Sequence, residues 1–89
     1  MIKRQIEIIN KLGLHARAAA KFVTLAAQYQ SNIQLVGNGR KVNGKSIMGV
    51  MMLAAGQGTS LDLVADGSDE NAAMDALEEL VKARFGEKE

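Results

Sequence analysis

The chain has 89 residues, enough for one domain with one hydrophobic core, and we expect a single domain over residues 1–89. Its 11 Lys and Arg nearly balance its 10 Asp and Glu, and aromatic residues are few, so no basic nucleic-acid-binding face is expected. Cysteine is absent and the single histidine has no second imidazole with which to share a metal ion, so neither disulfides nor a cofactor is expected.

The N-terminal segment carries too many charges for a signal peptide, and no apolar run approaches the ~20 residues that span a bilayer. We therefore expect a cytoplasmic protein without membrane insertion.

The first half of the chain predicts three strands and a helix. Residues 2–9 alternate between isoleucine and polar side chains, which is typical of a half-buried strand. From residue 16 to residue 27 or 28 the apolar side chains follow a helical spacing. Residues 33–35 alternate again, and the Gly-Asn-Gly of residues 37–39 predicts a hairpin to a short strand at 40–43.

The second half predicts two more helices and a fourth strand. Ser46 is a good N-cap for a short helix at residues 47–53. Residues 61–65 alternate as a strand does, and residues 73–81 have the apolar spacing of a helix that stops near Gly86. The order β-α-β-β-α-β-α predicts an α+β fold, with a four-stranded, mainly antiparallel sheet and three helices on one face.

The most informative segment is GLHARAA at residues 13–19, because the only histidine stands where the first helix begins. The first backbone N–H groups of a helix have no partner within it and attract anions, so we expect those of Ala16, Arg17 and Ala18 to bind phosphate oxygens. The guanidinium of Arg17 would add bidentate contacts. His15 would carry the phosphoryl group on its ring. The alternative is that His15 is merely a helix cap or a surface residue.

GLHARAAAKFV followed by GKSIMGVMML resembles the histidine-containing phosphocarrier (HPr) family of the bacterial phosphoenolpyruvate-dependent phosphotransferase system, over essentially the whole chain. The resemblance implies an open-faced β-sandwich, with His15 phosphorylated on Nδ1 by enzyme I and Arg17 as its phosphate partner. The acceptor would be a histidine of an enzyme IIA protein or domain, in sugar uptake or in the regulatory nitrogen branch. The family's usual proline after the arginine is Ala18 here, and we expect a small effect on stability and none on the chemistry.

The second motif, at residues 45–49, resembles the regulatory serine segment of the same family. It implies that an HPr kinase/phosphorylase modifies Ser46, adding about −1.5 to −2 charges beside the partner surface. Capping of the short helix is the structural role expected of the same serine, and the two roles are compatible.

The short helix has more apolar side chains than one buried stripe needs. We expect Ile47, Val50 and either Leu53 or Ala54 to serve the core, while the methionines form an adaptable surface for several partners. The predicted docking residues are Ala20, Ile47, Met48, Met51 and Met52.

Two other functions compete with that of a monomeric phosphoryl carrier, which would itself catalyse nothing. One is a regulatory interaction module controlled only by phosphorylation of Ser46, which the His15–Arg17 pair argues against. The other is a small nucleic-acid binder, which the near-neutral charge and missing stacking aromatics disfavour.

Overall fold

The computed structural model describes all 89 residues. The strands are β1 (Ile2–Glu7), β2 (Asn32–Gly37), β3 (Arg40–Asn43) and β4 (Ser60–Asp66), and the helices are α1 (Ala16–Ala26), α2 (Ile47–Met52) and α3 (Glu70–Lys82), followed by a 3₁₀ turn, η1 (Arg84–Gly86). The predicted β-α-β-β-α-β-α order is confirmed.

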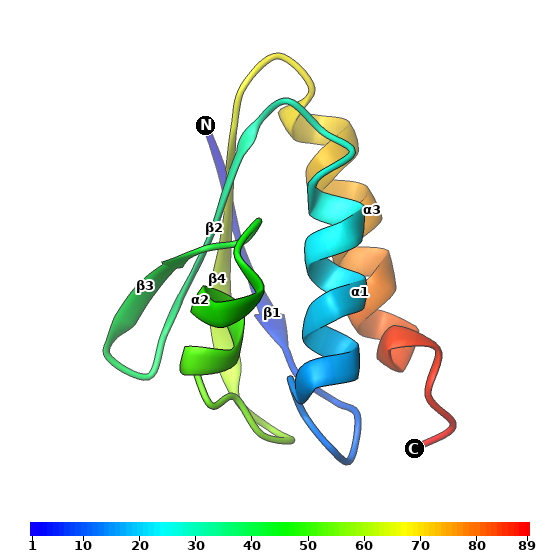
Figure 1. Ribbon diagram of the computed structural model, residues 1–89. Coiled ribbons are helices and arrows are strands. Elements are labelled where there is room, and N and C mark those ends of the chain that lie inside the picture. The colour runs from blue at the N-terminus through cyan, green and yellow to red at the C-terminus, as the bar shows by residue number, and fades with distance from the viewer.

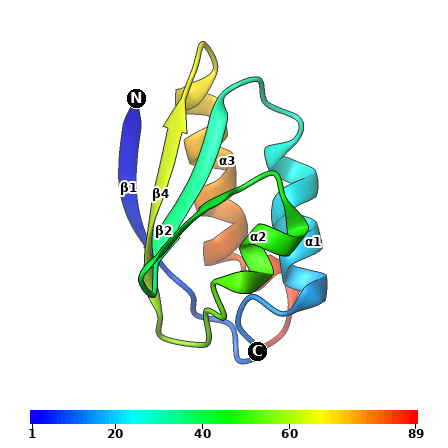
Figure 2. The same cartoon turned by 60° about the vertical axis from the view of Figure 1, so that its left-hand side comes forward.

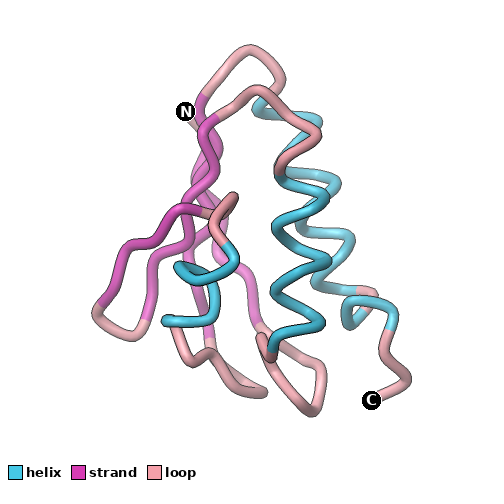
Figure 3. Tube along the Cα trace, in the orientation of Figure 1, coloured by secondary structure: helices cyan, strands magenta, loops and turns pink.

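The four strands form one sheet in the order β1-β4-β2-β3, and every neighbouring pair is antiparallel. Helices α1 and α3 lie side by side against one face, with α2 beside them near β3 (Figures 1 and 2). The other face of the sheet has no helix over it (Figure 3). The fold is therefore the predicted α+β class, with all three helices on one face.

The core lies between the sheet and the helices because strand alternation and helix periodicity point the apolar side chains to the same layer. Ile33, Leu35, Leu61 and Leu63 supply the sheet's side of this layer, and each is at most 1% exposed. Across from them the helices contribute residues that share one apolar face, namely Ala18, Ala19, Phe22, Ala26, Val50, Ala73, Met74, Leu77 and Val81.

Local signals set most of the element boundaries. In the β2–β3 hairpin, Asn38 and Gly39 have φ values of 50° and 75°, the positive pair that a two-residue turn of this kind requires. Helix α1 ends at Ala26 rather than at residue 27 or 28, because the amides of Gln28 and Tyr29 bond three residues back and tighten the chain into a turn.

Candidate functional site

His15 lies at the end of the loop from β1 to α1, and neighbouring bonds hold that loop in place. The Gly13 amide donates to the Asn10 carbonyl at 3.2 Å, and the amide of buried Leu14 donates to the Ala55 carbonyl at 2.8 Å. Gly13 has a φ of +69°, and a Cβ there would lie 2.5 Å from the Ala55 oxygen, so the close approach requires glycine.

The backbone of His15 occupies the N-cap position of α1, but its side chain makes no capping hydrogen bond. Its carbonyl accepts from the Ala19 amide at 2.8 Å. The amides of Ala16, Arg17 and Ala18 precede the first intrahelical bond and have no acceptor. The end of α1 therefore presents three unpaired donors next to the ring, and the side chain of His15 is free for another task.

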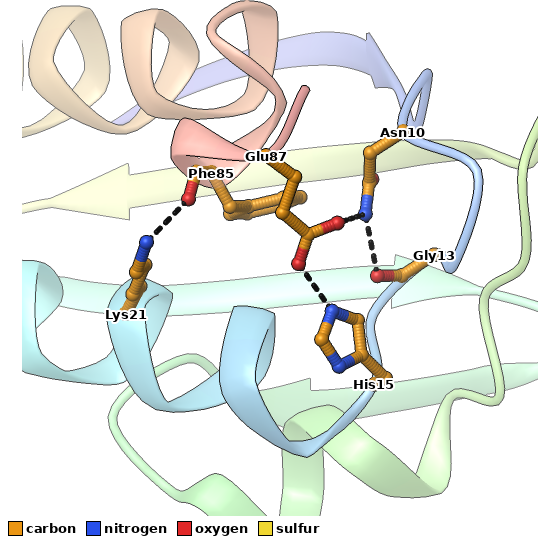
Figure 4. A network of polar contacts seen from close by, with 6 residues as sticks. All are labelled: Asn10, Gly13, His15, Lys21, Phe85 and Glu87. Atoms are coloured by element: carbon orange, nitrogen blue, oxygen red, sulfur yellow. Dashed lines mark hydrogen bonds and ion pairs between the residues drawn. The ribbon is translucent and has the colours of Figure 1, made fainter. Parts of the chain in front are cut away.

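The imidazole of His15 contacts a carboxylate from the far end of the chain. Its Nε2 bonds to Oε2 of Glu87, and the other oxygen of that carboxylate accepts from Nδ2 of Asn10 at 2.8 Å (Figure 4). Nδ1 of the ring has no partner and lies on the side turned away from Glu87. The His15 side chain is 29% exposed.

The same hydrogen bonds act on the charge of Glu87. The Asn10 amide, and after it His15, holds the pKa of the Glu87 carboxyl below its ordinary value, because both bonds favour the ionised form. At neutral pH the ring therefore faces a carboxylate.

A folded C-terminal tail brings Glu87 to this place. Arg84, Phe85 and Gly86 all have positive φ values, of 57°, 54° and 78°, and Phe85 is fully buried. Nζ of Lys21 on α1 donates to the Phe85 carbonyl at 2.7 Å. The tail ends beside the β1–α1 loop, where Lys11 donates its amide to the Glu89 carbonyl (Figures 1 and 2).

His15 and Arg17 line the same surface cleft, which has a volume of about 430 Å³. The cleft is lined by Lys11, Leu12, His15, Arg17, Glu87, Lys88 and Glu89. Arg17 is exposed and makes no ion pair with any protein group, so its guanidinium is available to an anion. The structure thus brings together the two side chains and three amides that the sequence singled out.

The second motif lies on α2, away from this cleft. Oγ of Ser46 accepts from the Gly49 amide at 3.1 Å, which confirms the predicted cap. Met48, Met51 and Met52 are exposed by 69%, 41% and 55%.

Helix α2 also requires a correction to the expected core. Ile47 is 40% exposed and Ala54 is exposed too, whereas Val50 and Leu53 are buried. A helix of six residues can turn only one narrow side to the sheet, so the expectation that Ile47 serves the core was wrong. Of the two residues expected at the third core position, Leu53 is the buried one.

Sequence reasoning missed Asn10 and Glu87, which stand out only in the folded chain. Asn10 is 0% exposed, although nothing around it in the sequence predicts burial. The one weak signal was the apolar Phe85 beside Gly86, where the sequence predicts that the last helix stops, whereas α3 ends earlier, at Lys82. Nowhere do three His, Cys, Asp or Glu residues group as metal ligands, and no helix is long and apolar enough to cross a membrane.

Unpaired amides at the start of a helix beside an imidazole nitrogen without a partner, in an antiparallel sheet fold covered on one face, suit a small carrier of phosphoryl groups. Comparisons with known proteins agree. Residues 2–83 match the family model described as "PTS HPr component phosphorylation site". The chain belongs to the HPr family of the phosphotransferase system, whose members carry a phosphoryl group and do not themselves catalyse its transfer.

Individual relatives match over the full length. The chain is 56% identical to a phosphocarrier protein HPr of Neisseria meningitidis and 57% identical to one of Cupriavidus necator, covering 100% of both sequences in each case. Among solved structures, HPr from Thermoanaerobacter tengcongensis superposes with a TM-score of 0.95 at 47% identity, again over 100% of both chains. Sequence and fold therefore agree along the whole chain.

Proposed function

We propose that His15 accepts a phosphoryl group on Nδ1 from enzyme I and passes it to a histidine of an enzyme IIA protein or domain. One observation carries the proposal: Nε2 of the ring is occupied by Glu87, while Nδ1 is free beside the unpaired amides of α1. Nδ1 is the ring nitrogen nearer the backbone, so a group bonded to it lies nearer to those amides than one on Nε2.

The transfer needs only alignment and charge stabilisation. The Nδ1 lone pair attacks phosphorus, the N–P bond forms, and the bond from phosphorus to the donor's nitrogen breaks with its electrons returning to the donor. The amides of Ala16, Arg17 and Ala18 and the guanidinium of Arg17 supply donors to the phosphoryl oxygens. Delivery to enzyme IIA is the same exchange in the other direction.

The partners would dock on the apolar surface that flanks the helix starts. We assign it the predicted residues Ala20, Ile47, Met48, Met51 and Met52, of which the four on α2 are each at least 40% exposed. Helices α1 and α2 pack against one another, so this surface continues from the His15 helix. Flexible methionines suit a surface that must fit both enzyme I and enzyme IIA. These partners, and hence the protein, would act in the cytoplasm.

The test of the acceptor uses phosphoenolpyruvate labelled in the phosphoryl group and purified enzyme I. We expect acid-labile, alkali-stable label on the protein and none on the His15→Ala variant. A His15→Ala protein that is folded and still takes up label would refute the assignment.

The docking surface is tested separately with Met48→Glu, which places a charge on the exposed surface of α2 without touching the cleft. We expect slower transfer from enzyme I with unchanged unfolding. Ala72→Glu is the control, because Ala72 is exposed on α3 and lies outside both the proposed surface and the cleft that holds His15. Equal effects of the two charges would contradict the assignment.

We further propose that an HPr kinase/phosphorylase modifies Ser46 to control docking. The supporting observation is that the Ser46 hydroxyl stands at the start of α2, directly before the exposed Ile47 and Met48. A phosphate there would place charge on an apolar contact surface, which disfavours binding by desolvation.

Two variants distinguish phosphoryl transfer from the alternative function of a purely regulatory module. If phosphoryl transfer is the function, His15→Ala abolishes it, while Ser46→Asp only weakens transfer from enzyme I. If regulation through Ser46 is the sole function, His15→Ala behaves as the unaltered protein in every partner-binding assay.

A further inference from the structure

The two oxygens of the Glu87 carboxylate have different partners, the side-chain amide of Asn10 and the imidazole of His15. Nδ2 of Asn10 lies 2.9 Å from the Gly13 carbonyl and 2.8 Å from Oε1 of Glu87, and both of these are acceptors. The nitrogen of the Asn10 amide must therefore point this way. Oε1 of Glu87 is thus held as an acceptor, which leaves Oε2 to face Nε2 of His15 (Figure 4).

An ionised carboxylate only accepts hydrogen bonds, so Nε2 of His15 must carry a proton. A neutral imidazole has one N–H proton, and its other nitrogen then holds a lone pair. We propose that Glu87 is a positioning residue that holds the neutral ring of His15 in the Nε2–H tautomer, so that Nδ1 presents its lone pair to the incoming phosphoryl group. The inference rests on the proposed function of Nδ1 as acceptor and adds that Glu87 fixes the tautomer in which Nδ1 can react.

The tail is built to hold Glu87 there at some cost in backbone energy. Arg84 and Phe85 are not glycines, and a left-handed backbone conformation is unfavourable for such residues because the Cβ atom crowds the following carbonyl oxygen. Full burial of the Phe85 ring and the bond from Lys21 to its carbonyl offset that cost. Backbone strain kept by its surroundings is typical of functional sites, and here its result is the placement of one carboxylate.

Glu87 also fits the charge change during transfer. When Nδ1 forms its bond to phosphorus, the proton remains on Nε2 and the ring gains a positive charge. The carboxylate facing Nε2 balances that charge on the side away from the phosphoryl oxygens. When the group leaves, the Nδ1 lone pair and the neutral Nε2–H ring are restored, so no proton has to leave the site.

Glu87→Gln is the decisive variant because it keeps the size of the side chain and replaces one acceptor oxygen of the carboxylate by an NH₂ donor. Asn10 still requires an acceptor, so the amide oxygen of the new glutamine faces Asn10 and its NH₂ group faces His15. Nε2 must then accept, and its proton moves to Nδ1. Glu87→Ala instead leaves Nε2 to water, and the ring becomes a mixture of both tautomers.

The direct measurement is ¹⁵N NMR of protein labelled in histidine, which reports one residue because the chain has one histidine. It is recorded without phosphorylation, at a pH where the ring is neutral. We expect the Nε2–H pattern in the unaltered protein, the reversed Nδ1–H pattern in Glu87→Gln and averaged shifts in Glu87→Ala. Glu89→Gln removes the same charge from the same tail and is expected to leave the pattern unchanged.

Transfer kinetics supply the second readout. Carboxylates that orient a metal-binding histidine contribute about 10- to 100-fold to function, and a carboxylate-to-amide change that gives the wrong tautomer costs about 10⁴-fold in serine proteases. We expect Glu87→Gln to slow phosphorylation by roughly 10-fold or more, and Glu87→Ala to slow it less. A merely structural role predicts the opposite order, since alanine removes more contacts.

Unchanged ring shifts in Glu87→Gln, or slower phosphorylation of Glu87→Ala than of Glu87→Gln, would overturn the inference. The backbone amide signals of Phe85 and Lys21 show whether the tail stays docked in each variant. Because the ring spectrum needs no phosphoryl donor, its outcome is separate from the labelling test of His15. A normal tautomer reversal without any label on His15 would contradict the proposed function alone.

Discussion

Asn10 and Glu87, 77 residues apart in the chain, are joined by a hydrogen bond of 2.8 Å between a buried amide and a carboxylate. The same Nδ2 also bonds to the Gly13 carbonyl, two residues before His15. One side chain thus ties the loop that carries the histidine to the tail that carries its carboxylate partner. Asn10 therefore holds the loop and the tail in one arrangement without itself bonding to the ring of His15.

Asn10→Ala is expected to destabilise the protein by about 1–3 kcal/mol, because it leaves the buried Gly13 carbonyl without a donor. The pKa of Glu87 is expected to rise toward its ordinary value, since the largest cause of its depression is removed. Urea unfolding measures the first effect and carboxyl NMR titration the second. Asn71→Ala, at an exposed position on α3, is the control, with a change within about 0.5 kcal/mol.

Stability at acid pH depends on carboxylates that the fold holds ionised. The Ser31 hydroxyl first, and then the Gln30 amide, lowers the pKa of Asp69 below its ordinary value. A carboxyl with a lower pKa in the folded state stabilises that state above its unfolded pKa of about 3.9, and this contribution is lost as the pH falls through the folded pKa.

Asp69→Asn is therefore expected to unfold at lower urea concentration than the unaltered protein at pH 7, and the gap is expected to narrow below about pH 4. Glu79→Gln, an exposed position without an ion pair, controls for loss of a negative charge. A gap of the same size at pH 3 and pH 7 would show that the Asp69 bonds do not depend on its charge.

Arg17→Ala is expected to separate function from stability. The side chain is exposed and unpaired, so the free energy of unfolding should change by no more than about 0.5 kcal/mol. A hydrogen bond to a charged group contributes about 1.5–3 kcal/mol, which corresponds to roughly 10- to 150-fold slower phosphorylation of His15. Arg40→Ala, also an exposed arginine, is the control in the enzyme I assay. A similar loss in both variants would point to general charge attraction instead.

Most of the fold was predictable because its signals are local. Alternation in residues 2–9, the Asn38-Gly39 turn and the Ser46 cap each depend on a few neighbouring residues. The sequence placed Ile47 both in the core and on the docking surface, because six helical residues contain too few turns for periodicity to say which side faces the core.

The candidate site was predictable only in part, for the same physical reason. His15, Arg17 and the helix amides are adjacent in the sequence, whereas Glu87 reaches the ring across 72 residues. Its position depends on consecutive positive φ values at Arg84 and Phe85, which are side chains that rarely adopt them. Tertiary burial of Phe85 selects that conformation, and the Phe85-Gly86 pair alone does not specify it.

Ser46→Ala is expected to cost about 1 kcal/mol, within the range of 0.5–2 kcal/mol typical of a lost N-cap, because the Gly49 amide loses its acceptor. Ser46→Asp keeps an oxygen at that place and should retain most of the stability. Thermal and urea unfolding measure both, with exposed Ser68→Ala as control. Equal stability of the alanine and unaltered proteins would leave regulation as the only role open to Ser46.

Gly13→Ala tests whether the close contact between Gly13 and the Ala55 carbonyl positions His15, apart from the left-handed backbone conformation that Gly13 adopts. The added Cβ would lie 2.5 Å from the Ala55 oxygen, so the loop must shift and carry His15 with it. Gly39→Ala is a matched control, because Gly39 has a similar φ of +75° but open space around its Cβ.

Each variant should lose about 1–2 kcal/mol of folding stability, because alanine is strained in the left-handed conformation. Gly13→Ala should lose more in urea unfolding and should also slow phosphorylation by enzyme I, whereas Gly39→Ala should not. Equal destabilisation of the two variants would show that the loop absorbs the new methyl group, and that its contact with Ala55 does not position the histidine.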